Sequence, residues 1–450
     1  MDANAQRSAR RRILGWWCFD IASQPHSTLV ITFIFGPYFA TVVGDAVRAQ
    51  TLWAAALTAS GLFIAMAAPV MGAMADRSGN LRGWVWGLSA LLVISMASLW
   101  FATPAMVHFT PVLIAVALSI IAVEMATIVT NAMLPGRAPK SEIGRLSGTG
   151  VALGYAGGLT SLIVMLLFFA ENGGGVTLLG QPPAFGLDPE TREGTRFAGP
   201  FSALWYMLFM VPFFIWVRPA PTAGSGQGVG SALRELARTL RRLPARQSLL
   251  AYLGSSMLYR DALNGLYSFG GLYASGVLGW SITQLGVFGI AGVLSAAVAS
   301  WLGGRADHAY GPKPVIAACI VILTVVSVTV VATTRVAIFG IAVAPDSIAP
   351  DVSMYICGSL IGGAGGALQA ASRTMMVRHA DPAPPTEAFG LYALSGKATA
   401  FLAPLLIGLA TAVSGDQRIG ISPLIVLFLV GLLLLVWVRK DGDIADGATA

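Results

Sequence analysis

The stretch GAMADRSGNLR at residues 72–82 and a related stretch, GGRADHAYGPK at residues 303–313, each follow a long apolar segment, roughly half a chain apart. Each is a short basic turn with one acid, and its repetition indicates an internally duplicated membrane protein. The second copy keeps Asp307 but has His308 where the first copy has an Arg.

The amino-acid composition excludes a soluble domain. Of the 450 residues, 56% are hydrophobic and only 11% are charged, which leaves more apolar surface than such a domain buries. A membrane-spanning helix needs about 20 apolar residues, and stretches of this kind recur along the chain. The sequence predicts an all-α integral membrane protein with twelve transmembrane helices in two pseudo-symmetric six-helix bundles.

The two predicted bundles occupy residues 1–217 and 248–450, and a cytoplasmic linker at residues 218–247 joins them. The linker begins with a run rich in Pro, Gly and Ser, which is typical of a flexible segment. Leu residues then recur at helical spacing while Arg residues take the other faces, which predicts an amphipathic helix on the membrane surface. We expect the loop at residues 171–198 to be irregular and exposed.

The distribution of basic residues predicts the orientation. Most of the 28 Lys and Arg residues fall on the side that holds both termini, and cytoplasmic loops are enriched in these residues. We therefore place both termini in the cytoplasm and the chain in a bacterial-type inner (plasma) membrane. The net charge of +7 follows from this topology, so no nucleic-acid partner is implied.

Ionisable residues inside the predicted spans are the first candidates for a transport site, because each costs a few kcal/mol or more unless it is paired or hydrated. Glu124 and Arg260 lie near the middle of their spans, which favours a functional role. The alternative is that such charges form structural ion pairs. The residues of this kind are Asp20, Glu124, Arg260, Asp261, Arg373 and Lys397.

Helical spacing adds polar neighbours to these charges, because residues three or four apart share a face. Tyr155 is a further candidate for lining a cavity, and so is Tyr267, with plain packing as the alternative for both. The three predicted polar faces are Asp20, Gln24 and Ser27; Glu124, Thr127 and Asn131; and Ser256, Arg260, Asn264 and Tyr267.

Six helices, a linker and six helices, with a basic turn after the second and eighth, resemble the major facilitator superfamily. In the first turn, four residues fit the loop motif of that superfamily: Gly72, Asp76, Arg77 and Gly79. An acid at a helix end can meet the positive N-terminus of a neighbouring helix, so the resemblance implies that Asp76 latches the cytoplasmic side. Because the second copy is less well kept, Asp307 is expected to latch it more weakly.

Further motifs follow in order along most of the chain: WWCFD at 16–20, TFIFGPYF at 32–39, NAMLP at 131–135, GYAGG at 154–158, YRD at 259–261, QAASR at 369–373 and FGLYALSGK at 389–397. These are similar to the vacuole-effluxer-like family, also called the unknown major facilitator family. The resemblance implies amino-acid export and adds Gln369 to the candidate site. The chain departs from the family after Asp20, where Pro25 and His26 occur, and at Ala262.

These observations predict a secondary transporter that exports a small polar or amphoteric, amino-acid-like solute by alternating access, with proton coupling. Glu124 would bind the proton, and Arg260 would bind an anionic group of the solute, with Asp261 orienting it. We expect a monomer whose partners are the small-molecule solute, membrane lipids and protons. Two alternatives remain: an exporter of lipids or hydrophobic drugs, and a non-transporting membrane scaffold or sensor.

Enzyme chemistry is not indicated. The four His and three Cys residues have neither the spacing of a metal site nor that of a nucleophile arrangement. The run at residues 390–397 resembles a phosphate-binding loop, but Ala398 stands where Ser or Thr belongs. We therefore expect no enzyme activity, no cofactor and no metal.

Overall fold

The computed structural model describes residues 3–78, 80–132, 143–217, 241, 244, 246–344, 346–379 and 395–440. For some of these only the backbone is described, among them residues 3–9, 72–78 and 143–148.

Long helices dominate the described chain. Shorter elements are η2 (Leu99–Phe101), η4 (Ala184–Gly186), α7 (Glu193–Arg196), α16 (Gln417–Ile421) and the antiparallel strands β1 (Ala337–Ile338) and β2 (Ile341–Ala342). The longer elements are α1 (Ala3–Pro25), the π-helix η1 (His26–Phe33), α2 (Phe35–Val43), α3 (Ala46–Ser78), α4 (Leu81–Ser98), α5 (Thr110–Ala132), α6 (Ile143–Phe168), α8 (Ala198–Trp216), α10 (Gln247–Leu278), α11 (Ile282–Tyr310), α12 (Pro312–Ala332), α13 (Ala349–His379), α15 (Leu402–Ser414) and α17 (Pro423–Leu435).

Within the described residues, nine helical segments are long and apolar enough to cross a membrane. The apolar part of α6 is shorter, and α10 and α13, of 32 and 31 residues, interrupt their apolar faces with charged and amide side chains. These three complete the twelve spans of the predicted fold. The polar interruptions matter for function, because a bilayer tolerates them only where water or a partner is available.

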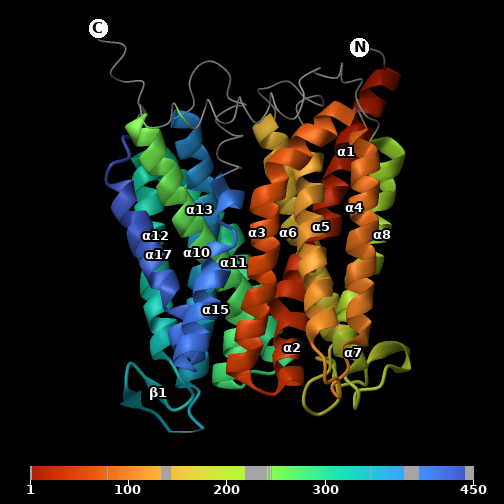
Figure 1. Cartoon of the computed structure of the whole chain (residues 1–450), viewed down its shortest axis with the longest axis vertical. Helices are drawn as coiled ribbons and strands as arrows, with labels where there is room; N and C mark the ends of the chain where they lie inside the picture. Colours follow the sequence, from red (N-terminus) through yellow and green to blue (C-terminus); the bar gives the residue numbers. More distant parts are fainter. Residues whose placement is uncertain are drawn as a thin grey trace. The chain divides into compact units, whose positions relative to one another are not determined.

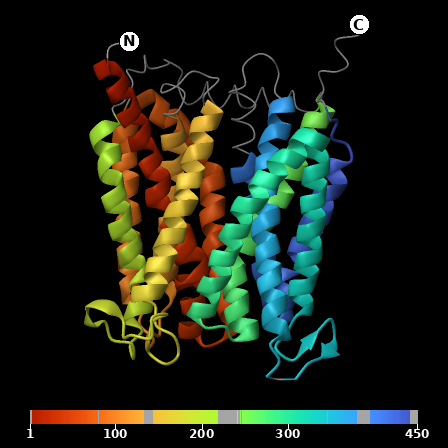
Figure 2. The ribbon, with the colours of Figure 1, turned by 180° about the vertical axis from the view of Figure 1, so that it is seen from behind.

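Two compact units make up the structure (Figures 1 and 2). The first comprises residues 1–44, 66–233 and 281–286, and the second comprises residues 45–65, 234–280 and 287–450. In the first unit α1 packs against α6 and α8, and α4 packs against α5 and α8. In the second unit α17 packs against α10 and α12, and α12 also packs against α13. The first part of α3 belongs to the second unit.

Aromatic side chains contribute to the core of the first unit and its edge, and two indoles use their N–H groups to satisfy backbone carbonyls. The indole of Trp16 donates to Thr130 O at 3.0 Å. The indole of Trp205 donates to Ile21 O, also at 3.0 Å. Pro25 has no N–H to offer this carbonyl four residues earlier, so Trp205 supplies the donor that the proline removes.

The first part of α3 packs onto α15 and α16 in the second unit through a buried polar contact. Gln50 Nε2 donates to Thr411 Oγ1 at 2.7 Å and to Gln417 O at 3.2 Å. All three residues are buried. The same two helices, α3 and α15, also make an apolar contact, because a β-carbon at Gly408 would lie 2.9 Å from that of Ala54.

The glycine run of α13 allows close helix packing. A β-carbon at Gly362 would overlap the backbone of Gly292 on α11, and one at Gly366 would lie 2.8 Å from Ala296 O. A β-carbon at Gly365 would instead overlap the hydroxyl of Tyr267 on α10. Small residues of this kind let membrane helices approach each other.

The loop between α6 and α8 is irregular, as expected, but the prediction that it is exposed is wrong at its two ends. Glu171, Thr195 and Arg196 are buried. Thr195 Oγ1 donates to Glu171 Oε1 at 2.9 Å, and Arg192 Nε lies 3.3 Å from the same oxygen. Burial raises the pKa of the Glu171 carboxyl, and hydrogen bonds together with the Arg192 charge oppose that shift. Composition did not reveal this buried pair.

Candidate transport site

Some of the residues predicted for the site lie, with neighbours that were not predicted, in two groups, one in each unit, whereas Asn131, Tyr155, Gln369 and Arg373 are in neither group. We call them the α1 cluster and the α10 cluster. The α1 cluster comprises Asp20, Gln24, His26, Thr28, Ser119 and Glu124. The α10 cluster comprises Tyr259, Arg260, Asp261, Asn264, Tyr267, Ser372, Gly396 and Lys397.

In the α1 cluster, glycines of α6, two of them in the GYAGG motif, leave room for residues of α1 and η1. A β-carbon at Gly150 would collide with the carboxylate of Asp20, and one at Gly154 would lie 3.2 Å from Asp20 O. A β-carbon at Gly158 would come within 2.7 Å of both Gln24 Cγ and Thr28 Oγ1. The two motifs predicted on separate helices are therefore in direct contact.

The transition from α1 to η1 alters the face predicted for the first span. Ser27 is exposed, whereas His26 and Thr28 are buried. The prediction that Ser27 shares the face of Asp20 and Gln24 assumed the α-helical period. The π-helix begins at His26 and has a wider turn, so Thr28 takes the place expected for Ser27.

His26 is a site residue that the sequence interpretation missed. Its side chain is only 3% exposed, and its Nε2 lies 2.8 Å from Ser119 Oγ on α5. Its Nδ1 has no hydrogen-bond partner among the described residues. The carboxylate of Glu124 lies close enough to act on the imidazole electrostatically. The signal was the departure from the family motif at this position.

The α5 side of the cluster presents a partly open polar face within a membrane span. Glu124 and Thr127 are half-buried, and Asn131 is exposed. On α6, Tyr155 is 38% exposed. Polar groups at this depth require water or a partner.

In the α10 cluster, the consecutive residues Tyr259, Arg260 and Asp261 contact three different segments. Tyr259 OH lies 2.8 Å from Ser372 Oγ of the QAASR motif. The Arg260 guanidinium occupies the space next to Gly396 of the helix-eleven motif, where a β-carbon would come within 2.6 Å of it. Three motifs that are far apart in the sequence thus meet around α10.

Asp261 caps a broken helix. Its Oδ2 accepts a hydrogen bond from Ala403 N at 2.7 Å, at the start of α15. A turn at residues 399–401 separates α15 from the preceding helical residues, 395–398. A carboxylate at a helix N-terminus is favoured by the helix dipole. That Asp261 also orients Arg260 remains a prediction.

The remaining predicted residues of the second unit differ in exposure. Arg260 and Tyr267 are half-buried, and Asn264 between them is exposed, so α10 presents an open polar face in mid-span. Lys397 and Gln369 are half-buried. Arg373 is exposed, next to the buried Ser372.

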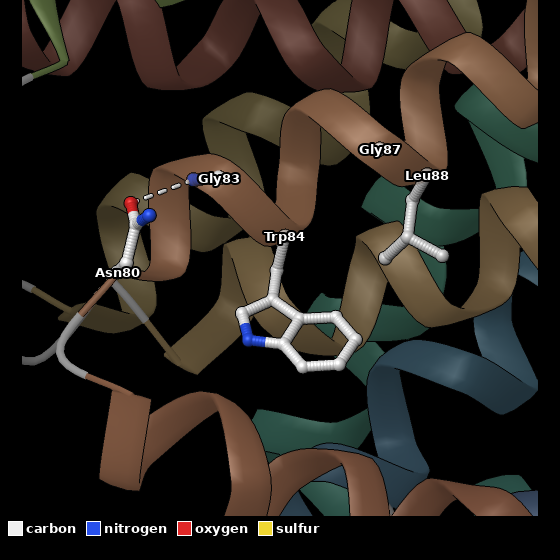
Figure 3. Close-up of a pocket in the computed structure, with 5 residues that line it drawn as sticks. All are labelled: Asn80, Gly83, Trp84, Gly87 and Leu88. Atoms are coloured by element: carbon white, nitrogen blue, oxygen red, sulfur yellow. Dashed lines mark hydrogen bonds between the residues drawn. The ribbon is translucent and has the colours of Figure 1, made fainter.

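Two hollows lie away from these clusters. One, of about 420 Å³, is lined by Asn80, which precedes α4, and by Gly83, Trp84, Gly87 and Leu88 of α4 (Figure 3). The amide side chain in this lining, that of Asn80, already takes part in a hydrogen bond, because its Oδ1 accepts from Gly83 N at 2.9 Å. The other, of about 560 Å³, is an apolar groove formed by α11, α12 and α13. Among the described residues, neither lining contains a charged side chain.

The two copies of the loop motif are unequally described. Gly72, Asp76 and Arg77 lie on the last turns of α3, where only the backbone is described, and Gly79 lies outside the described residues. The linker at residues 218–247 is likewise outside them, apart from residues 241, 244, 246 and 247.

In the second copy, Asp307 is buried, and its Oδ1 has no hydrogen-bond partner in the described part of the chain. Gly311 ends α11 with a φ of 84°, a conformation that favours glycine. The latch roles of Asp76 and Asp307 stay predictions. Within the described ranges, no three His, Cys, Asp or Glu side chains gather as a metal site requires.

The fold, the matching family model and its relatives identify this chain as a membrane transporter of the major facilitator superfamily, and not an enzyme. The chain belongs to the vacuole effluxer Atg22 like family, whose model matches residues 41–447.

Relatives support this assignment. An uncharacterized MFS-type transporter, YxiO of Bacillus subtilis (strain 168), is 22% identical over 436 residues, which cover 95% of this chain and 94% of YxiO. Autophagy-related protein 22 of Coccidioides immitis (strain RS) is 24% identical over 66% of this chain, and the match spans 49% of the fungal protein. The crystal structure of a D-xylose–proton symporter shares the fold, with a TM-score of 0.67 at 13% identity over 98% of this chain and 99% of the symporter.

Proposed function

We propose that this protein exports a small polar or amphoteric, amino-acid-like solute by alternating access and couples that movement to protons. One observation carries the proposal: each unit presents a partly open polar face within its apolar spans. The face on α5 holds an acid, Glu124, and the face on α10 holds a base, Arg260. The base can bind the anionic group of such a solute, and the acid can take part in proton binding.

The α10 cluster is suited to binding an anionic group. A guanidinium donates in a planar fork that matches a carboxylate, and Gly396 leaves room for that of Arg260. Lys397 follows directly and adds a second positive charge. We therefore assign the carboxylate of the solute to Arg260, with Asn264 and Tyr267 on the same face.

The direction, orientation and assembly belong to the same proposal. The family description names an effluxer, which favours export. The Lys and Arg distribution supports cytoplasmic termini and a bacterial-type inner membrane. A monomer suffices, because both polar faces are present in one chain.

Substitution of Arg260 tests the assignment of the anion site. The purified protein is screened against amino acids for ligand-induced thermal stabilisation, since a ligand that binds the folded state raises the Tm. For a stabilising amino acid, Arg260→Ala should weaken binding by about tenfold or more, as expected for loss of a hydrogen bond to a charged group. The affinity of Arg260→Lys should lie between those of the wild type and of Arg260→Ala.

Arg305→Ala is the matched control, because Arg305 is exposed and its guanidinium lies 3.4 Å from the Trp301 ring centroid on α11. It should bind like the wild type. Unchanged affinity in Arg260→Ala would sink the anion assignment. Stabilisation by lipids or hydrophobic compounds alone would favour the alternative exporter, for which the apolar groove of α11, α12 and α13 is the candidate site.

A further inference from the structure

We propose that His26 and Glu124 together form the proton-binding site of this transporter, and that the coupling proton binds at Nδ1 of His26. The inference rests on the proton coupling in the proposed function and identifies its acceptor atom. Nothing in the family motif points to it, because the histidine lies where the chain departs from that motif.

The hydrogen bonds around Ser119 determine which nitrogen of His26 carries a proton. Ser119 Oγ donates its hydrogen to Val116 O at 2.7 Å. A hydroxyl has one hydrogen, so Ser119 Oγ accepts at its contact with the imidazole. His26 Nε2 is therefore the donor, at 2.8 Å. In the neutral ring the lone pair then lies on Nδ1.

Nδ1 is a buried basic atom in a position to take up a proton. It has no hydrogen-bond partner within the described ranges, and the His26 side chain is almost fully buried. A buried polar atom without a partner is costly, which makes this site unusual for a purely structural histidine. Uptake of a proton at Nδ1 supplies that atom with a hydrogen while Nε2–H keeps its bond to Ser119.

The charge created by protonation has a partner on the same helix as Ser119. A buried cation requires compensation, and Glu124 is the ionisable group that acts on His26 electrostatically. Asp20 on α1 lies against the glycines of α6. The helices that pack against η1 also carry three phenols: Tyr38 on α2 donates to Ala102 O, Tyr206 on α8 lies 2.8 Å from Ser89 Oγ, and Tyr155 on α6 is exposed.

The backbone at His26 supports a special role for this position. Pro25 interrupts the α-helical hydrogen bonds, Trp205 caps the carbonyl of Ile21, and η1 begins at His26. A π-helical segment inside a longer helix occurs frequently at functional sites. Here it buries His26 and Thr28 together and leaves Ser27 exposed.

Nitrogen NMR of the ¹⁵N-histidine-labelled full-length protein tests the site without solute or a gradient. The chain has four histidines, and loss of a signal in His26→Gln assigns His26. At neutral pH we expect a protonated Nε2 and an unprotonated Nδ1. In Glu124→Gln, protonation of Nδ1 should require a pH lower by about one unit or more, because an opposite charge has been removed.

Two NMR outcomes would overturn the proposal: a neutral ring protonated at Nδ1, and a titration of His26 that is identical in Glu124→Gln. The titration needs no transport, so its result is independent of the transport assays. It can refute the role of His26 while the protein still transports solute, and it can support that role even if transport proves not to be coupled to protons.

The transport consequence is measured with His26→Gln and with His108→Gln as its control, since His108 is exposed outside the spans. We expect His26→Gln to keep solute exchange and to lose proton-driven accumulation. Accumulation equal to that of the control would contradict the assignment. A combined loss of exchange and of the thermal transition would assign His26 to structure instead.

Discussion

Proteoliposomes containing Glu124→Gln are expected to exchange solute across the membrane but to build up no solute gradient when a proton gradient is imposed. A difference of about one pH unit supports roughly tenfold accumulation per coupled proton, because one unit corresponds to about 1.4 kcal/mol. The wild type should approach that ratio, whereas the variant should stay near one. Glutamine keeps the size of the side chain and removes its charge, so packing around α5 is preserved.

Glu190→Gln is the matched control, because Glu190 is exposed in the loop between α6 and α8. It should accumulate solute like the wild type. Wild-type accumulation by Glu124→Gln would remove the coupling role of Glu124. If Glu124→Gln loses both exchange and accumulation but still binds its solute in the thermal-shift assay, Glu124 is required for the movement of the solute.

Gly362→Ala is expected to destabilise the second unit markedly. The added β-carbon would overlap the backbone of Gly292, so α11 and α13 must separate along their contact. Overpacking of a well-packed interior costs about 1–3 kcal/mol. We expect a clear fall in the Tm of the purified protein, followed by the fluorescence of its tryptophans during heating.

Gly304→Ala makes the same chemical change on α11 at a position where nothing lies within 4 Å of the new β-carbon. Alanine also favours helix over glycine, so the Tm of Gly304→Ala should stay the same or rise. Opposite signs for the two variants would confirm that backbone contact, not glycine as such, is what α13 requires. Equal Tm values would contradict the close packing.

Much of the fold could be predicted from the sequence, because its physical causes are local. Apolar length determines which segments cross a membrane. The motifs at 16–20, 154–158 and 259–261 also lie on helices of the candidate site. In the structure Asp20 contacts Gly150, and Arg260 contacts Gly396.

The missed features depend on tertiary contacts or on a change of helical period. The prediction that Ser27 shares the face of Asp20 assumed a fixed spacing of three or four residues, which cannot represent the π-helix η1. The bond from Asp261 to Ala403 requires the break before α15. The contact of Gln50 with Thr411 joins segments 361 residues apart, for which one sequence contains no local signal.

The central claim is that this chain moves a polar solute together with protons, and solute-evoked proton movement tests it most directly. Purified wild-type protein is placed in liposomes that enclose a pH-sensitive dye, and amino acids are added without an imposed gradient. We predict a change of internal pH on addition of a solute that stabilises the protein, and no such change with Glu124→Gln. Flux of that solute without any proton movement would contradict the coupling, and the absence of flux for every polar solute would contradict the transport function itself.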